Sequence, residues 1–308
     1  MDQRHLISIH DLSRSETDEI FSLASRVKAD PARFGGALEG KSLGMIFQKS
    51  STRTRVSFEV GMTQLGGHAL FLSSSDIQLG RGETISDTAQ VLSRFVDCIM
   101  ARTFAHQDVV DLANYGSIPV INGLTDDLHP CQGMADFMTV REVFGEDLSG
   151  RKIAYVGDGN NVAHSLLFGA GKAGMNIAIA SPSGFAVDER YLEFARVDAA
   201  EAGIEIQITE DPVAAVTGAS AVYTDVWASM GQEDEAESRL RAFEGFQVDE
   251  PLMAHALPEA IFLHCLPAHR GEEVSAGVAD GPQSRIFDQA ENRLHVQKAI
   301  LLWLLGAG

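Results

Sequence analysis

A short segment that follows an apolar run carries hydroxyl and guanidinium groups in a pattern suited to binding an anion. The run Ser42–Phe47 predicts a buried strand, and Ser51–Arg55 brings three hydroxyls and two arginines to the start of a predicted helix. Free N–H groups and the dipole at a helix N-terminus favour an anion, and arginine binds phosphate through two parallel hydrogen bonds. The alternative is a capped surface helix with solvated arginines. The concentration of positive charge in an acidic chain favours a phosphate site, although the glycines of a Walker loop are missing.

Polar residues also follow two other predicted strands in the first half of the chain. Arg102 comes directly after the apolar run 98–101, and His129–Gln132 follows the run 118–121 after a short loop. Alone, Arg102 would be a surface charge and His129 a capping or buried histidine. Because the carboxyl ends of parallel strands meet at one edge of a sheet, their equivalent positions favour convergence on one ligand.

The second half contains a turn, 155–162, that is similar to a dinucleotide-binding turn. Val162 occupies the position of the third glycine, and the next strand ends in Ala180–Pro182 without an acid for a ribose. An NAD site therefore fails two of its requirements. Asn160 and Asn161 stand at the start of the following helix, where they either cap it or hold a polar ligand.

An acid and a thiol follow two later strands. Asp225 comes after the run 221–224, and Cys265 ends the run 261–265. Separately, the acid would be a turn residue and the thiol a small buried hydrophobe. Together, at two strand ends, they suggest a site for an amine.

The hydrophobic pattern predicts the elements that must position these residues. Apolar residues recur at helical spacing in some segments, and short apolar runs alternate with them. The predicted helices are 13–29, 52–65, 85–95, 109–115, 130–144, 162–172, 187–200 and 288–305. The predicted strands are 42–47, 68–72, 98–101, 118–121, 152–156, 176–180, 204–208, 221–224 and 261–265. The alternation implies right-handed βαβ units that restart near residue 150, so we predict an α/β fold of two Rossmann-like domains with parallel sheets.

Composition excludes several classes of protein. The 308 residues are 45% apolar, which is ordinary for a globular chain. Their formal charge of −19 makes the chain strongly acidic. Such a surface repels nucleic acid and anionic lipid, so neither is an expected partner. The apolar stretch Ala299–Leu305 is too short to span a bilayer. A phosphate site must therefore be built from locally concentrated positive charge.

Three cysteines, Cys98, Cys131 and Cys265, are few and widely spaced, which favours reduced thiols and a cytoplasmic location. The N-terminus lacks the apolar core of a signal peptide. The most polar stretch, Gly231–Glu244, predicts either a solvated helix or loop, or a lid.

Taken together, these motifs resemble those of the ornithine carbamoyltransferases, in order and spacing over nearly the whole chain. The Ser51–Arg55 element is shared by the wider aspartate/ornithine carbamoyltransferase superfamily. In this superfamily, elements such as Ser229–Gly231 and His264–Pro267 distinguish the ornithine enzymes from the aspartate enzymes. One departure is Gln48, where family members often carry Glu. The matching segments are Phe47–Arg55, Asp76–Glu83, His129–Gln132, Asp225, Ser229–Gly231, His264–Pro267 and Ala290–Arg293.

The resemblance implies a carbamoyl phosphate-binding domain, 1–148, and an ornithine-binding domain, 149–287. It implies that a C-terminal helix, 288–308, packs back on the first domain. It also implies a homotrimer in which Gln78 reaches the active site of a neighbouring subunit. Neither a metal nor an organic cofactor is expected.

The resemblance also assigns roles to individual residues. The catalytic set is Arg102, His129, Asp225 and Cys265. Ornithine binding falls to Asn161, Asp225, Ser229 and Met230. Carbamoyl phosphate binding falls to Ser51, Thr52, Arg53, Thr54, Gln78, Arg102, His129, Pro130, Cys131, Gln132, Cys265, Leu266 and Arg293.

The expected reaction is carbamoyl transfer from carbamoyl phosphate to the side-chain amine of L-ornithine, which yields L-citrulline, a step of arginine metabolism. Aspartate, putrescine and N-acetylornithine are alternative acceptors, but Ser229–Gly231 and Cys265 favour free ornithine. An NAD oxidoreductase and a non-catalytic regulatory homologue are alternatives from other classes. Biosynthetic and degradative directions both stay open.

Overall fold

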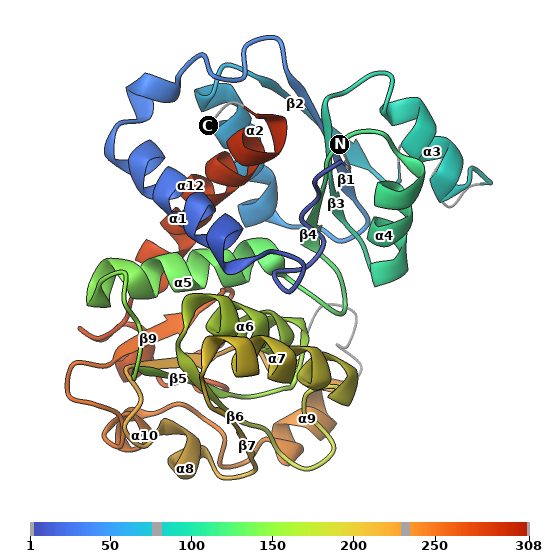
Figure 1. Ribbon diagram of the computed structural model, residues 1–308. Coiled ribbons are helices and arrows are strands. Elements are labelled where there is room, and N and C mark those ends of the chain that lie inside the picture. Colours follow the sequence, from blue (N-terminus) through green and yellow to red (C-terminus); the bar gives the residue numbers. More distant parts are fainter. Residues whose placement is uncertain (1–2, 76–81, 229–234, 307–308) are drawn as a thin grey trace. The chain divides into compact units, whose positions relative to one another are not determined.

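The computed structural model describes residues 3–75, 82–228 and 235–306 and divides the chain into two compact units (Figure 1). Unit 1 comprises Met1–Met134 and Glu291–Gly308, and unit 2 comprises Ala135–Ala290. Both boundaries fall inside helices, namely α5 (Pro130–Phe144) and α12 (Ile286–Leu305).

Unit 1 contains a parallel sheet in the order β2-β1-β3-β4. Its strands are β1 (Ser42–Phe47), β2 (His68–Ser73), β3 (Cys98–Arg102) and β4 (Val120–Leu124). The strand order reverses between β1 and β3, and the carboxyl ends of strands at such a point form the usual ligand crevice of open α/β sheets. The predicted anion segment and Arg102 follow these two strands.

Helices cover both faces of this sheet. They are α1 (Arg14–Ala29), α2 (Thr52–Gln64), α3 (Ile85–Leu92) and α4 (His106–Tyr115), with a short 3-10 helix, η1 (Pro31–Phe34). Figure 1 shows α3 and α4 on one face and α1 and α2 on the other. The apolar side chains of α3 and α4 pack on β1, β3 and β4 in one buried cluster.

The C-terminal helix returns to unit 1, as predicted. Trp303 Nε1 donates to Glu19 of α1 at 3.1 Å, and Lys298 Nζ donates to Gln64 of α2 at 2.9 Å. Val296 and Ile300 are fully buried on the same helix, and each buried aliphatic side chain of this size stabilises the fold by about 2 kcal/mol. Helix α12 therefore contributes to the stability of unit 1.

Strand β4 differs from its prediction, because it runs three residues beyond the expected end at Ile121. Asn122 and Gly123 have the composition of a turn, yet both lie inside the strand. The amide of Asn122 donates to the carbonyl of Ile7 at 3.0 Å, and a Cβ on Gly123 would lie 2.4 Å from the sulfur of Met100. Close packing against neighbouring segments overrides the local turn preference.

Unit 2 contains a second parallel sheet, in the order β7-β6-β5-β8-β9. Its strands are β5 (Lys152–Val156), β6 (Asn176–Ala180), β7 (Ile206–Thr209), β8 (Ala221–Thr224) and β9 (Ile261–His264). The order reverses between β5 and β8, so the candidate ligand residues after β5, β8 and β9 follow strands at and beside the reversal. The two parallel sheets confirm the predicted fold class.

Two long helices pack together in unit 2, and four short ones join its other core. The helices are α6 (Asn161–Ala173), α7 (Glu189–Ala202), α8 (Pro212–Val216), α9 (Ala236–Ala242), α10 (Glu250–Met253) and α11 (Ala276–Ala279). Lys172 of α6 and Asp198 of α7 form a buried ion pair at 2.8 Å. Trp227 and Phe243 stack in the core that includes α8, α10 and α11.

We predict that Gly159, directly after β5, tolerates no side chain. Its N–H donates to the carbonyl of Phe185, and a Cβ would lie 2.3 Å from the backbone nitrogen of Val187. Gly159→Ala should lower the free energy of unfolding by at least about 2 kcal/mol, because backbone must move. Gly36→Ala is the control, since nothing lies within 4 Å of its added Cβ. Urea unfolding followed by circular dichroism measures both, and equal midpoints would contradict the prediction.

Candidate active site

Hydrogen bonds through Arg293 link the candidate anion-binding segment after β1 to α12 and α5. Ser51 caps α2, with the Thr54 N–H donating to its hydroxyl at 3.2 Å. Arg293 of α12 donates to the Thr54 hydroxyl at 2.7 Å and to the Gln132 side-chain oxygen of α5 at 3.2 Å. A guanidinium thus joins two helix N-termini, where backbone N–H groups favour an anion.

Positive charge surrounds His129, which precedes α5 and is almost fully buried. Its pKa is lowered well below the ordinary value, first by burial and then by the charges of Arg293, Arg102 and Arg53. The imidazole is therefore neutral near pH 7, so it serves as a hydrogen-bond donor or acceptor rather than as a cation. Three arginines around one neutral imidazole suit a ligand that carries a phosphate and a polar carbonyl group.

Cys131 lies in the same region, but its thiol is buried and bonded to the backbone. The thiol is fully buried and donates to the carbonyl of Asn122 at 3.5 Å. Burial raises its pKa to about 12, so it is neither a thiolate nucleophile nor a metal ligand at neutral pH. We expect any contact of Cys131 with a ligand to come from its backbone.

The departure at Gln48 has a structural reason. Its side-chain nitrogen donates to Asp108 at 3.0 Å, and its side-chain oxygen accepts from the Phe104 N–H at 3.1 Å. A glutamate would lose the donor and place a second carboxylate against Asp108. Lys49, the next residue, pairs with Asp126 and lies 4.6 Å from the ring of Phe104, so both side chains brace the entry to the anion segment.

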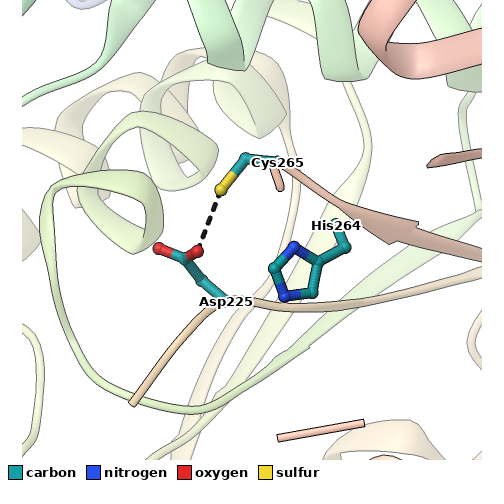
Figure 2. Close-up of side chains that lie close together, drawn as sticks. All are labelled: Asp225, His264 and Cys265. Carbon is teal, nitrogen blue, oxygen red and sulfur yellow. Dashed lines mark hydrogen bonds between the residues drawn. The ribbon is translucent and has the colours of Figure 1, made fainter. Parts of the chain in front are cut away.

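In unit 2, Asp225 and Cys265 meet as the sequence predicts. The Cys265 thiol donates to Asp225 Oδ1 at 2.9 Å, and the Asn160 amide donates to Asp225 Oδ2 at 2.9 Å. Figure 2 shows the sulfur directed at the carboxylate, while the ring of His264 lies beside the pair. Three strand ends therefore contribute one polar cluster. The carboxylate is nearly buried, and Cys265 is half-buried.

Sequence reasoning missed the support beneath Cys265. His264 Nε2 lies 3.1 Å from Oε1 of the fully buried Glu273, and His264 Nδ1 accepts from the Leu266 N–H at 2.9 Å. The two bonds favour the tautomer with hydrogen on Nε2. Leu266 has φ of 60°, a left-handed conformation that is costly for a branched side chain. The His264 bond holds the backbone of this residue.

Of four further predicted site residues, the structure describes only Asn161. Asn161 opens α6 and is half-buried, next to the capping residue Asn160. Gln78, Ser229 and Met230 lie outside the described residues. Within the polar stretch Gly231–Glu244, the structure describes residues 235–244, which contain α9.

Arg239 anchors α9 beside this cluster. Its guanidinium donates to Asp158 at 2.8 Å and to the Trp227 carbonyl at 2.9 Å. The pKa of Asp158 is nevertheless raised, because burial outweighs the opposing charge of Arg239. The pair ties the turn after β5 to the segment after β8.

Among the described residues, the Asp225–Cys265 cluster does not offer an open metal site. Asp225, His264 and Cys265 do place one ligand atom each within 4.8 Å of one another. Both ring nitrogens of His264, however, are already engaged by Glu273 and Leu266. The cluster is better suited to holding a polar substrate group than to holding an ion.

Comparison with known families assigns both units. The carbamoyl-P binding domain of aspartate/ornithine carbamoyltransferases matches residues 4–142, and the Asp/Orn binding domain of the same enzymes matches residues 149–304. The chain belongs to the aspartate/ornithine carbamoyltransferase family. Arg53, Arg102 and His129 fall within the match to the carbamoyl-P binding domain, whereas Arg293 falls within the match to the Asp/Orn binding domain. The Asp225–Cys265 cluster falls in the Asp/Orn binding domain.

Individual relatives are similar over nearly their full length. An ornithine carbamoyltransferase of Symbiobacterium thermophilum is 60% identical over 306 residues, which cover 98% of each chain. An anabolic ornithine carbamoyltransferase of Pyrococcus furiosus is 56% identical over 291 residues, 94% of this chain and 91% of the relative. The solved structure of an ornithine carbamoyltransferase from Pyrococcus furiosus superposes with a TM-score of 0.95 at 54% identity, and the match covers 98% and 97% of the two chains.

We predict that the His129 side chain stays neutral at a pH where an ordinary histidine side chain becomes protonated. Its lowered pKa means that the unfolded chain binds more protons below about pH 6.5, so this group destabilises the fold as the pH falls through that value. The Cε1–H resonance of His129 should keep the chemical shift of a neutral imidazole at about pH 6.5, where an ordinary histidine is half protonated. Its disappearance in His129→Gln assigns the signal, and an ordinary titration midpoint would refute the prediction.

Proposed function

We propose that the protein is an ornithine carbamoyltransferase, which converts carbamoyl phosphate and L-ornithine to L-citrulline and phosphate. The observation that carries the proposal is the Asp225–Cys265 contact in a domain of a family that binds aspartate or ornithine. An acid, a thiol and an amide suit an amino acid with a second amine. They do not suit the second carboxylate of aspartate, and the nearby Arg239 already binds Asp158 and Glu235.

Unit 1 would hold carbamoyl phosphate. Ser51, Thr52, Arg53, Thr54 and Arg293 would bind the phosphate, and Arg293 also donates to the Thr54 hydroxyl. Arg102, His129 and Thr54 would donate to the carbonyl oxygen, where each pre-positioned donor is typically worth about 3–4 kcal/mol in the transition state. Gln132 and the Leu266 backbone would hold the carbamoyl amide. Further contacts with this substrate would come from Pro130, Cys131 and Cys265.

Unit 2 would hold ornithine. Asn161, Asp225, Ser229 and Met230 would bind its amino-acid end, and Cys265 would direct the side-chain amine. The neutral amine nitrogen attacks the carbonyl carbon and forms the new C–N bond, the C–O bond to phosphate breaks, and the phosphate takes the proton released by nitrogen. Because the leaving group is already good, the enzyme mainly orients the reactants, which is worth about 7–11 kcal/mol.

We also propose a homotrimer in which Gln78 of one subunit reaches the neighbouring site. Support comes from apolar side chains that unit 1 leaves exposed on the edge strand β2 and on α2. Leu70 and Phe71 are about 40% exposed and Val56 is 50% exposed, and Arg55 lies 3.8 Å from the ring of Phe71. An apolar patch beside the anion segment suits a contact between subunits.

We also propose a cytoplasmic location. None of the three cysteines, all of which the structure describes, forms a disulfide bond, which supports a cytoplasmic location. Among the residues that the structure describes, no helix is long and apolar enough to cross a membrane. The Pyrococcus furiosus relative is named anabolic, and we propose a role in arginine biosynthesis on that basis.

The decisive test is carbamoyl transfer to a panel of amines. With carbamoyl phosphate present, ornithine should give citrulline with a kcat/KM at least about 100-fold above that for aspartate, putrescine or N-acetylornithine, because a polar group left unpaired in the site costs about 3 kcal/mol. Chromatography of the carbamoylated products measures each acceptor. Preference for another amine would move the protein to another branch of its family, and no product with any amine would refute the proposal.

We predict that Cys265 serves the acceptor and not the fold. Cys265→Ser should raise the KM for ornithine and shift the pH optimum, because a serine hydroxyl is a much weaker acid than a thiol. The thermal midpoint should stay near that of the wild type. Cys98→Ser is the matched control, since Cys98 is fully buried at the start of β3. That variant should lose stability and keep its ornithine KM. Reversal of the two patterns would make Cys265 a structural thiol.

A further inference from the structure

The loop that follows β9 brings an imidazole and two carboxylates together outside the candidate active site. His269 Nδ1 lies 3.6 Å from Glu272 Oε2 and 3.9 Å from Glu273 Oε2. The three groups place one ligand atom each within 4.8 Å of one another. The catalytic and substrate-binding roles proposed above use none of these side chains.

Glu273 supplies the observation that points to a ligand. Its side chain is fully buried, and Oε2 accepts no hydrogen bond from any residue that the structure describes. Oε1, by contrast, accepts from His269 N–H and contacts His264 Nε2. A buried carboxylate oxygen that lacks a donor is costly, and this one faces His269 and Glu272.

The backbone around the three groups is fixed. The Val248 N–H donates to the Glu273 carbonyl at 2.8 Å, and the side chain of Gln247 donates to the Glu272 carbonyl at 2.7 Å. Arg270, the cation within the loop, is turned away to a two-bond pair with Asp280. The nearest arginine along the chain therefore leaves the two carboxylates to another partner.

We propose that His269 Nδ1, Glu272 Oε2 and Glu273 Oε2 bind one divalent cation of the zinc class. A nitrogen and two carboxylate oxygens form a common protein ligand set for zinc, with water as the fourth ligand. Ligands about 2.1 Å from a tetrahedral ion lie roughly 3.4 Å apart, so small side-chain movements close the observed gaps. The acidic chain favours a cation over an anion here.

The site has an outer shell that links it to Cys265. Glu273 shares its two oxygens between the ion and His264, whose Nδ1 accepts from the Leu266 N–H. Second-shell partners of this kind orient the ligating carboxylate. The ion takes no part in the proposed carbamoyl transfer, and its binding stands or falls independently of that function.

Calorimetric titration of the full chain with zinc chloride tests the proposal. The Cys265→Ser variant serves as the background, because it removes the thiol of the neighbouring Asp225–His264–Cys265 cluster. We expect one zinc ion per chain there. His269→Ala and Glu272→Gln, each added to this background, should weaken binding by more than tenfold. His269 and Glu272 are half-exposed, so their replacement should leave thermal unfolding without metal unchanged.

His255→Ala is the matched control, since His255 is exposed in the same unit, and it should leave the zinc affinity unchanged. Cobalt(II) absorption of the wild type gives a second readout, because nitrogen and oxygen ligands give d–d bands without a thiolate-to-cobalt charge-transfer band. Three results would each overturn the proposal. They are no zinc binding, equal affinity after His269→Ala, and a thiolate band that disappears together with all binding in Cys265→Ser.

Discussion

The guanidinium of Arg293 is the interaction on which the first unit depends. It donates to Thr54 at the start of α2 and to Gln132 at the start of α5, so residues from three distant parts of the chain meet at one group. The C-terminal helix must therefore return to unit 1 before the anion segment has its final shape. Burial of His129, together with the positive charges of Arg293, Arg102 and Arg53, lowers the pKa of that imidazole and keeps it neutral. A single ion thus couples the architecture of the unit to its chemistry.

The sequence predicts the long elements well, because their hydrophobic periods are strong. All nine predicted strands occur, and the sheet order could follow only from the contacts between strands. The four-residue helices α10 and α11 and the five-residue α8 were not predicted, since so short a segment shows less than two turns of periodicity. Strand β4 was misplaced because Asn122 and Gly123 have turn chemistry locally, whereas their packing against Ile7 and Met100 is a tertiary effect.

The candidate site shows the same division. The Asp225–Cys265 contact was predicted because both residues end strands of one parallel sheet, and such ends converge by topology. The support from Glu273 was not predicted. It lies nine residues beyond His264, across a loop that contains the left-handed Leu266, and no sequence period describes such a path. Gln48 is a related case, because its value lies in donating to Asp108 while accepting from Phe104, which only three-dimensional contacts reveal.

The arginines around His129 in unit 1 are positively charged, whereas the Asp225–Cys265 cluster in unit 2 is acidic. This difference explains how one chain could bind both proposed substrates. A dianionic phosphate needs the arginines of unit 1 in a molecule of net charge −19. An amine acceptor needs an acidic environment to bind, yet it must lose a proton before its nitrogen can attack. A bare carboxylate would hold the amine in its unreactive ammonium form. Asp225 is not bare, because the Cys265 thiol and the Asn160 amide each donate to one of its oxygens. These two donors spread the negative charge of Asp225, so the carboxylate can bind the amino-acid end of ornithine while it favours the protonated form of the nearby side-chain amine less strongly.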